Sequence, residues 1–402
     1  MVRVASLFSQ LLQHFPRAQF EALARKHNAE RHAKGFNCWT QFVAMLFCQL
    51  GRADSLREIC GGLSCCLGKL VHVGIDRPPN KSTLSYANRH RPAAFYEAVF
   101  WSSLERFRSD GALGPPQHKF RFKNKLLSLD STVVTLCLSL FPWADYRRAK
   151  GGIKLHVLLD HDDYLPQYAL ITDARQHDVR AAHLLDLTPG SIVVEDRGYN
   201  DYALFGKWTD NNVYFVTRLK EGAAYEIVTA RPQAFDRDIH ADQDIRLTGT
   251  SAEEKCPHTL RRVVVWDAEN GRSIVLLTNI HHLAATTLGD IYKDRWQIEL
   301  FFKALKQNLK IKTFVGTSEN ALRIQIWTAL LAMLLLKWLH HLSRAGWSLS
   351  TMAAMLRMNL FTYRALREWL EKPFDTPPMV PSPEQLALPL AGLGQRPSFA
   401  SR

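Results

Sequence analysis

The sequence IYKDRWQIELFFKALKQNLKIK, residues 291–312, predicts one long helix with a single buried stripe. Its apolar side chains recur at the i, i+3, i+4 and i+7 spacing that a helix of about 3.6 residues per turn brings onto one face. The stripe consists of Ile291, Ile298, Phe302, Leu305 and Leu309. One face of this helix is therefore expected to lie against the rest of the fold.

The neighbouring face of the same helix carries one acid among three cations and a phenol. Its members are Tyr292, Arg295, Glu299, Lys303 and Lys306. Glu299 is suited to hold a divalent ion, and the cations beside it are suited to hold nucleic-acid phosphates. The alternative is a solvated helix face, because Arg295–Glu299 and Glu299–Lys303 are i, i+4 pairs worth about 0.2–0.5 kcal/mol each. The helix by itself does not decide between the two.

Composition and charge indicate a folded protein with a polyanionic partner. The 402-residue chain is 47% hydrophobic and 22% charged, and its formal net charge is +13. Such an excess favours nucleic acid. A membrane is not expected, because residues 326–336 supply about half of the roughly 20 apolar residues that a span requires. The N-terminus lacks a signal-peptide pattern, which predicts a cytoplasmic protein. Its seven cysteines, including the cluster at 60–66, fit no metal-binding template and are expected to be reduced thiols.

The first 114 residues have helical patterns separated by Gly and Pro signals. Within them, residues 80–92, NKSTLSYANRHRP, predict a helix with basic and aromatic side chains. This helix could enter a DNA groove, or it could be a solvated basic helix. GALGPP at 111–116 then marks a boundary, after which the pattern changes to strands.

Two further acids stand out by their place in predicted strands. Asp130 lies inside the β-rich run 126–136. Burying a carboxylate in such a strand costs several kcal/mol of folding free energy unless it is paired or binds a metal. Asp196 follows the short strand 192–195, at a strand end of the kind where α/β sheets place their chemistry. Short β-like segments then fill 221–279, including a tight turn at Asn270-Gly271, before the Glu299 helix.

Each acid alone has a structural explanation, but the order strand, strand, helix is more restrictive. Carboxylate oxygens are the ligands that magnesium prefers. Two such ions about 3.5–4 Å apart activate the attacking oxygen and stabilise the leaving oxygen of an in-line phosphoryl displacement. The three acids therefore suit chemistry on a nucleic-acid backbone.

The segments LSLDST around Asp130 and EDRGY at Asp196, with the spacing Tyr292-x2-Arg295-x3-Glu299-x6-Lys306, resemble the DDE transposases of bacterial insertion sequences. The closest group is the insertion-sequence-four family, which is defined by that Tyr-Arg-Glu-Lys signature. The resemblance covers roughly residues 120–315.

This resemblance implies a mixed α/β fold with a ribonuclease-H-like catalytic core interrupted by an all-β insertion. Together with the sequence pattern it implies the following division: 1–114, helical DNA-binding domain; 115–220, first part of the core; 221–279, β insertion; 280–316, second part of the core with the Glu299 helix; 317–372, C-terminal helical region; 373–402, flexible tail.

The resemblance also implies the site. Asp130, Asp196 and Glu299 are expected to be catalytic and to hold two divalent ions, Mg²⁺ or Mn²⁺. Tyr292, Arg295 and Lys306 are expected to grip the end of the element, with Lys303 as a further DNA contact.

The implied partner is double-stranded DNA, both the inverted-repeat ends of the element and the target, bound by a homodimer in the bacterial cytoplasm and its nucleoid. The implied reaction is cut-and-paste transposition by nicking, hairpin formation, hairpin opening and strand transfer. In relatives an aromatic residue of the insertion stacks on a flipped base. Trp266 is the candidate here, with a plain core residue as the alternative.

Two other functions remain open on the sequence. A ribonuclease-H-like nuclease would cut DNA without strand transfer, although Tyr292, Arg295 and Lys306 suit prolonged holding of one DNA end. A non-catalytic DNA-binding regulator derived from a transposase would retain the fold, although all three acids are present.

Overall fold

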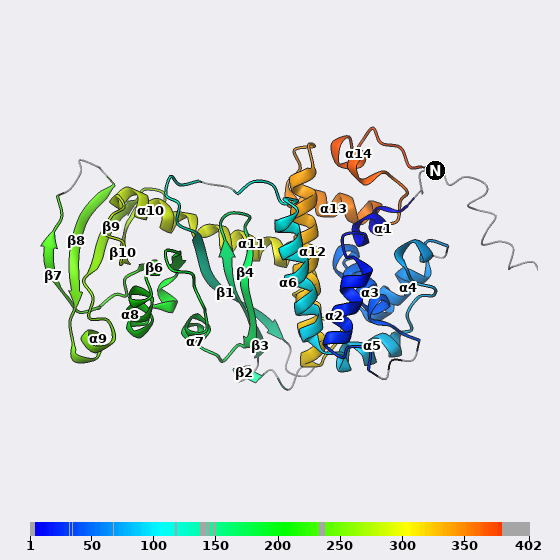
Figure 1. Cartoon of the computed structure of the whole chain (residues 1–402), viewed down its shortest axis with the longest axis horizontal. Coiled ribbons are helices and arrows are strands. Elements are labelled where there is room, and N and C mark those ends of the chain that lie inside the picture. Colours follow the sequence, from blue (N-terminus) through cyan, green and yellow to red (C-terminus); the bar gives the residue numbers. More distant parts are fainter. Residues whose placement is uncertain are drawn as a thin grey trace, which may run out of the picture. The chain divides into compact units, whose positions relative to one another are not determined.

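The computed structural model describes residues 5–31, 33, 35–66, 68–116, 119–136, 143, 145–147, 150–232 and 238–379. The chain divides into two compact units (Figure 1). Unit 1 comprises Met1–Gly114 and Ala304–Arg402, and unit 2 comprises Pro115–Lys303. The division falls inside helix α11 (Trp296–Asn308), within the segment expected as the second part of the core.

Unit 1 is helical, and its N-terminal and C-terminal segments pack into one body. Residues 1–114 and 317–372 are expected from sequence to be separate regions, but here they share a core. The described helices of this unit, besides the end of α11, are α1 (Leu7–Leu12), α2 (Arg17–Lys26), α3 (Cys38–Gly51), α4 (Leu56–Ser64), η1 (Val71–Val73), α5 (Lys81–His90), α6 (Ala93–Ser109), α12 (Glu319–Leu342), α13 (Leu349–Asn359) and α14 (Leu366–Glu371).

Helix α12 is the centre of this unit. It packs against α3, α5, α6 and α13, and it is apolar on nearly every side. By length and composition it could cross a membrane, but 89% of its most apolar 18-residue window is buried inside the protein. A helix that is hydrophobic all round is a core helix when other helices cover it. Residues 326–336 therefore belong to a buried core helix, as the sequence predicts.

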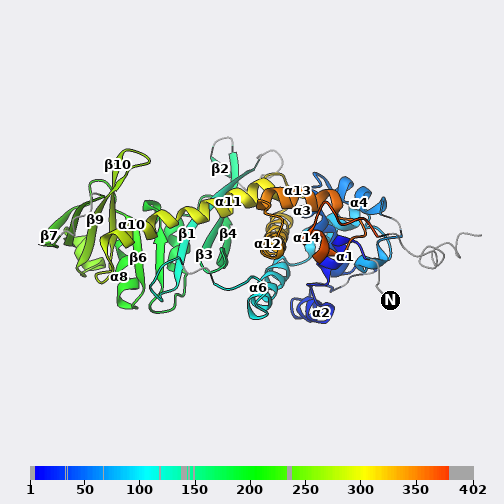
Figure 2. The same ribbon diagram turned by 90° about the horizontal axis from the view of Figure 1, so that it is seen from above.

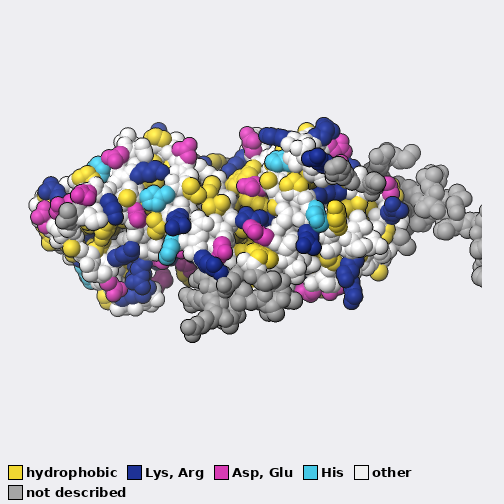
Figure 3. Space-filling view, turned by 90° about the horizontal axis from the view of Figure 1, so that it is seen from below, with side chains coloured by type: hydrophobic (Ala, Val, Ile, Leu, Met, Phe, Trp, Pro, Cys, Tyr) yellow, Lys and Arg dark blue, Asp and Glu magenta, His cyan; other side chains and the backbone are white. Residues whose placement is uncertain are grey.

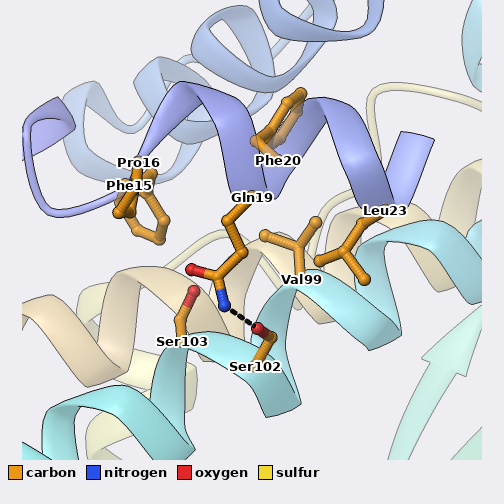
Figure 4. A pocket seen from close by; sticks show the side chains of 8 residues that line it. All are labelled: Phe15, Pro16, Gln19, Phe20, Leu23, Val99, Ser102 and Ser103. Atoms are coloured by element: carbon orange, nitrogen blue, oxygen red, sulfur yellow. Dashed lines mark hydrogen bonds between the residues drawn. The ribbon is translucent and has the colours of Figure 1, made fainter. Parts of the chain in front are cut away.

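Local pairings hold the surrounding helices in place. A β-bridge joins Ser6 to Tyr363, which fixes the N-terminus against the segment between α13 and α14. Helix α5 begins at Asn80, whose side chain accepts a hydrogen bond from the backbone N–H of Ser82. Helix α2 lies against α6, where Gln19 Nε2 donates to Ser102 Oγ over 2.6 Å. A pocket between these two helices is lined by Phe15, Pro16, Gln19, Phe20, Leu23, Val99, Ser102 and Ser103 (Figure 4).

Unit 2 is built on one sheet of ten described strands. Their order is β2-β3-β1-β5-β6-β10-β9-β8-β7, and β4 pairs with the far side of β3. The strands are β1 (Leu126–Leu136), β2 (Asp145–Arg147), β3 (Lys150–Asp160), β4 (Leu165–Asp173), β5 (Ile192–Glu195), β6 (Tyr214–Arg218), β7 (Tyr225–Ala230), β8 (Ile239–Leu247), β9 (Leu260–Asp267) and β10 (Arg272–Thr278). The helices of this unit are α7 (Asp178–His183), η3 (Arg197–Tyr199), α8 (Tyr202–Asp210), α9 (Thr250–Lys255), α10 (Ala285–Asp294) and the start of α11.

The strand directions give the ribonuclease-H-like arrangement. β4, β3 and β1 form an antiparallel meander, and β5 and β6 then follow parallel to β1. The parallel pairs are connected through α7 and α8, as parallel strands require a crossover. The mixed α/β class expected from sequence is thereby confirmed.

The insertion is β-rich, as expected, and it continues the core sheet directly. β10 pairs antiparallel with β6, and β9, β8 and β7 follow outward. The β9–β10 hairpin turns at Asn270-Gly271, where Gly271 has a φ of +60°. A backbone with positive φ favours glycine, which explains the tight-turn signal. The insertion is not all-β as predicted, because helix α9 lies between β8 and β9, where the strand-like alternation of the sequence gives no sign of it.

The two faces of the sheet are covered by different helices. On one face, α8 contributes Phe205 and Trp208, and the Phe205 ring stacks on Phe215 of β6 with centroids 4.4 Å apart. On the other face, Leu288 and Ile291 of α10 pack against apolar side chains of β1, β5, β6, β9 and β10 (Figures 1 and 2). The parallel strands β5 and β6 are thus buried on both faces, as parallel strands usually are.

Two expectations extend beyond the described residues. The tail at 373–402 lies outside them from residue 380 onward. Among the cysteines, six are described and all six are free, while Cys137 lies outside the description.

The contact between α8 and α9 yields a test of this packing. A Cβ added to Gly206 of α8 would lie 2.2 Å from the carbonyl oxygen of Lys255. We expect Gly206→Ala to lower the free energy of unfolding by about 1–3 kcal/mol, because the backbone must shift to relieve the clash. Thermal unfolding of the full chain measures this change. Gly61→Ala on α4 is the control, since a Cβ there meets nothing within 4 Å. An unchanged melting temperature for Gly206→Ala would contradict the α8–α9 packing.

Candidate active site

Parallel pairing of β1 with β5 places two of the predicted acids next to each other. The register pairs Leu129 with Glu195 at the end of β5. Asp130 and Asp196 are the next residues on their respective segments. Because adjacent strands lie about 4.8 Å apart, two side chains at matching positions are neighbours when they point to the same face.

Side-chain alternation shows that both acids point to the α10 face. Leu126 of β1 and Val194 of β5 belong to the same buried cluster as Ile291 of α10. Asp130 lies four residues after Leu126, and Asp196 lies two after Val194, so the period of two returns each acid to that face. The two acids therefore project beside the end of α10.

Arg295 brings the third acid to the same place. Its Nη2 donates to Glu299 Oε1 over 2.7 Å, and its Nη1 lies 3.8 Å from Asp130 Oδ2. The Arg295 side chain is only 14% exposed, so both contacts are partly shielded from solvent. The Tyr292 ring lies beneath the guanidinium, with the centroid 5.7 Å from Cζ, and the phenol also interacts electrostatically with Asp196. Arg295 thus lies between Asp130 of β1 and Glu299 of α11, and Asp196 interacts electrostatically with Asp130 and Tyr292 beside them.

The single long helix predicted over 291–312 is wrong in two respects: it is broken at Arg295, and its second part ends at Asn308 rather than at residue 312. Helix α10 ends at Asp294, and α11 begins at Trp296. Arg295 lies between them, and its backbone N–H donates to the carbonyl of Tyr292 three residues back rather than four. This tighter turn breaks the α-helical ladder locally. The break sits at the residue whose side chain binds both acids.

Burial and neighbouring charges set the protonation of the site. Burial raises the pKa of Asp130 to about 6, while the backbone N–H of Ser131 and the Arg295 guanidinium act to lower it. The charges of Glu299 and Asp196 raise it further. Burial acts to lower the pKa of Arg295, but Tyr292, Glu299 and Asp130 outweigh it and raise that pKa overall. The acids therefore carry mutual repulsion that one cation only partly offsets.

The donor set fits a hard divalent cation. Carboxylate oxygens dominate it, and a cation already binds two of the three acids. Within the described part of the chain, no three His, Cys, Asp or Glu side chains stand close enough to chelate a metal as they are placed. Arg295 bridges Asp130 and Glu299 at present, so metal binding requires this guanidinium to move away from one of them.

A second polar cluster lies on the opposite face of β1. Ser131 Oγ donates to Asp178 Oδ1 over 2.7 Å, and Lys154 Nζ donates to both oxygens of that carboxylate over 3.2 Å. Glu195 is fully buried on this face, and neither of its oxygens has a hydrogen-bonding partner among the described residues. Burial raises the pKa of Glu195 well above its usual range. A neutral Glu195 adds no further negative charge beside Asp196.

Besides Tyr292 and Arg295, the predicted DNA contacts lie on α11 and β9. Lys303 is exposed one turn after Glu299, and Lys306 follows on the same helix. Trp266 on β9 is 36% exposed and stacks on His240 of β8 with centroids 5.6 Å apart, so it is not a buried core residue. On the face of the molecule in Figure 3, Lys and Arg side chains are interspersed with Asp and Glu.

Trp296 is an exposed aromatic residue that sequence reasoning missed. It is 56% exposed and lies three residues before Glu299 on α11, so both side chains occupy the same helix face. Leu300, also exposed, lies beside them. The available signal was a tryptophan on the polar side of an amphipathic helix, directly after Arg295.

Comparison with known families gives two matches along this chain. The family described as Transposase DDE domain matches residues 121–335, which include all three acids. A family described as Domain of unknown function (DUF4372) matches residues 3–76.

Three curated proteins from bacteria are similar in sequence. A Sinorhizobium fredii protein named as the transposase y4zB is 30% identical over 76% of this chain and 83% of its own length. A Geobacillus stearothermophilus protein named as the transposase for insertion sequence element IS5377 is 32% identical over 56% of this chain and 59% of its own length. A Synechocystis protein named as the transposase for insertion sequence element IS4SA is 27% identical over 69% of this chain and 75% of its own length.

Among solved structures, a piggyBac transposase synaptic complex with hairpin DNA is similar at 11% sequence identity and a TM-score of 0.47. The alignment covers 98% of this chain and 89% of that one.

The raised pKa of Asp130 predicts a pH-dependent gain of stability when its charge is removed. The folded protein holds this proton up to about pH 6, whereas an unfolded chain loses it near 3.8. The stabilising contribution is complete below about pH 4 and is lost as the pH rises through 6. At pH 7.5 we expect Asp130→Asn to stabilise the metal-free protein by up to about 3 kcal/mol, with no gain at pH 4.

Urea unfolding at the two pH values, in the presence of a chelator, measures this difference. Asp178→Asn is the matched control, because it removes a carboxylate that Lys154 and Ser131 already satisfy, and it should destabilise the protein at pH 7.5. A loss of stability for Asp130→Asn at pH 7.5 would show that the Asp130 carboxylate is not strained.

Proposed function

The chain belongs to the DDE transposases of insertion sequences, and from this premise we propose that it cuts such an element at both ends and joins it to target DNA. The observation that supports the proposal is the Arg295 guanidinium lying between Asp130 and Glu299, with the charge of Asp196 also acting on Asp130. The net charge of +13 suits a DNA partner. Its place of action is the bacterial cytoplasm, on the nucleoid.

The three acids are the proposed metal ligands and catalytic residues. Two divalent ions, Mg²⁺ or Mn²⁺, held by Asp130, Asp196 and Glu299 would activate the attacking oxygen and stabilise the leaving oxygen at phosphorus. Asp130 lies on β1, Asp196 directly follows the adjacent strand β5, and Glu299 lies on α11. Arg295, once displaced from Asp130, is positioned to bind a DNA phosphate beside the acids, because its planar fork suits that group.

The proposed reaction uses one kind of displacement four times. Water attacks a phosphorus at the element's end, forms a new P–O bond, and releases a 3′ hydroxyl as the leaving oxygen takes a proton. That hydroxyl attacks the opposite strand and gives a hairpin, a second water opens the hairpin, and the regenerated 3′ hydroxyl attacks target DNA. Each step exchanges one P–O bond for another, so a single site with one set of acids serves all four.

The remaining proposed contacts hold the DNA during this series. Tyr292 on α10 and Arg295 at the following turn border the acids, and Lys303 and Lys306 lie further along the chain on α11. Unit 1, which includes the predicted DNA-binding helices of residues 1–114, would bind the inverted-repeat ends. Two chains would act together on the two ends, as a homodimer on DNA.

Trp266 is the proposed stacking platform for a base flipped out beside the hairpin. Its exposed ring already stacks on the His240 imidazole, and aromatic stacking is worth about 1–3 kcal/mol per base. Flipping a base costs a few kcal/mol, which such stacking offsets in part.

Glu299→Gln provides the direct test of the catalytic proposal. The variant keeps the size of the side chain and removes its charge, so we expect end binding within about threefold of the unchanged protein and nicking reduced at least about a thousandfold. The substrate is linear DNA carrying the inverted repeats that flank the reading frame, with Mg²⁺ and a target plasmid. Joined products distinguish a transposase from a nuclease that only cuts. Nicking by Glu299→Gln at the normal rate would refute this metal site, and cutting without joining would favour the nuclease.

Trp266→Ala separates hairpin formation from nicking. Loss of the ring should reduce hairpin yield about tenfold, as expected from a stacking energy near 1–2 kcal/mol, while the first nick persists. Trp266→Phe retains an aromatic face and should restore most of the yield. Denaturing gels of end-labelled DNA resolve the nicked and hairpin products. An equal hairpin yield for Trp266→Ala would remove this residue from the mechanism.

A further inference from the structure

Unit 2 contains a buried hydrogen-bonded chain next to the acids that the proposed reaction does not use. Ser128 Oγ lies 2.7 Å from His161 Nε2, and His161 Nδ1 lies 2.8 Å from Asp294 Oδ2. Lys119 Nζ donates to the other carboxylate oxygen, Asp294 Oδ1, over 2.7 Å. Ser128 is 0% exposed, His161 5% and Asp294 4%. The chain joins β1, the turn between β3 and β4, and the end of α10.

The order Ser–His–Asp is that of a hydrolytic triad, but burial excludes a nucleophilic role. A nucleophilic hydroxyl must reach the substrate, and Ser128 has no exposed surface. Any effect of this buried hydrogen-bonded chain is therefore exerted on neighbouring residues of the protein and not directly on a substrate.

Both ends of the chain lie next to residues of the candidate active site. Ser128 precedes Asp130 by two positions on β1, so the two side chains share the α10 face. Asp294 is the last residue of α10 and directly precedes Arg295. His161 thus ties the strand that carries one acid to the helix end that carries the guanidinium bridging two of them.

The hydrogen-bonding inventory shows why an imidazole is suited to this place. Asp294 accepts from Lys119 on one oxygen and from His161 Nδ1–H on the other, so both of its oxygens are used. Burial acts to raise the pKa of Asp294, but the hydrogen bonds from His161 and Lys119 outweigh it and hold that pKa below its usual value. When the ring proton is on Nδ1, Nε2 is the nitrogen that can accept from the Ser128 hydroxyl. The imidazole ring therefore contacts the Ser128 hydroxyl through one nitrogen and the Asp294 carboxylate through the other.

The turn that carries His161 is itself anchored to β1. The backbone N–H of His161 donates to the carbonyl of Leu126 over 3.1 Å, and Lys125 Nζ contacts Asp160 Oδ2 at 2.8 Å. The Tyr164 ring packs edge-on against the imidazole with centroids 5.6 Å apart. His161 is therefore held both by the hydrogen bond of its backbone N–H and by the contact of its ring with Tyr164.

We propose that His161, through Ser128 and Asp294, is a positioning residue that fixes Arg295 and Glu299 relative to Asp130. The inference rests on the proposed function, since it assigns a role in arranging the same acids. Groups that orient metal ligands from outside typically change metal affinity or activity about 10–100-fold when they are removed. Loss of His161 should therefore loosen the acids without altering the surfaces that bind DNA.

His161→Phe tests this, because it keeps a ring of similar size and removes both hydrogen bonds. Three quantities are to be measured on the full chain with its flanking inverted repeat. They are the Mn²⁺ affinity, by electron paramagnetic resonance; the rate of single-turnover nicking at saturating DNA; and end binding, by fluorescence anisotropy. We expect Mn²⁺ affinity to fall about tenfold and the nicking rate to fall about tenfold or more, with end binding within about twofold.

Two further variants make the result decisive. Ser128→Ala removes one hydrogen bond and leaves the His161–Asp294 contact, so it should give a smaller fall of about threefold in both quantities and decides the matter if His161→Phe does not fold. His156→Gln is the matched control: it is an equally buried histidine of β3 that faces the other side of the sheet, bonded to Thr172. It should leave Mn²⁺ affinity and nicking within about twofold even if it lowers the melting temperature.

The outcomes separate the two proposals. Normal Mn²⁺ affinity and nicking in folded His161→Phe, or in Ser128→Ala when His161→Phe does not fold, would overturn the positioning role. A loss of end binding in proportion to nicking would overturn it as well, because that pattern indicates general destabilisation. If the unchanged protein neither binds Mn²⁺ nor nicks the DNA, the proposed function itself fails and the inference fails with it.

Discussion

Repulsion among carboxylates gathered on one face of a sheet is the constraint on which this candidate active site depends. Asp130 and Asp196 follow a pair of matched strand residues, and Glu299 reaches them from the helix that crosses the same face. Without a cation between them, such a group would be expelled to solvent or protonated. The Arg295 guanidinium supplies that cation here, and it binds two of the acids. A divalent ion would offset the repulsion between these carboxylates more strongly than the single charge of Arg295 does.

The surrounding structure serves to hold that face still. β1 is buried between two strands and under two layers of helices, so Asp130 has little freedom to turn away. Helix α10 packs its apolar side on the sheet and ends beside the acids, and a single turn residue, Arg295, connects it to α11. The strands of the insertion extend the core sheet, because β10 pairs directly with β6. Its Trp266 is thereby carried on a rigid element rather than on a loop.

Much of this arrangement was predictable from local patterns, and the exceptions have physical reasons. The strand at 192–195 and the Asn270-Gly271 hairpin follow from runs of β-branched residues and from turn chemistry, which act over a few residues. The break at Arg295 did not, because the apolar spacing of the flanking helices continues across it. The role of His161 was also hidden, since a histidine in a polar turn looks solvated until Ser128 and Asp294 arrive from distant parts of the chain. Likewise, the shared core of unit 1 depends on contacts between its first and last helices.

A crystal structure of the protein bound to its flanking inverted repeat and soaked with Mn²⁺, with anomalous scattering recorded to locate the metal, tests the central claim most directly. The account predicts anomalous peaks bounded by carboxylate oxygens of Asp130, Asp196 and Glu299, with Arg295 withdrawn from Asp130 and directed to a DNA phosphate. Peaks elsewhere, or one of the three acids turned away while Arg295 still bridges the other two, would contradict it.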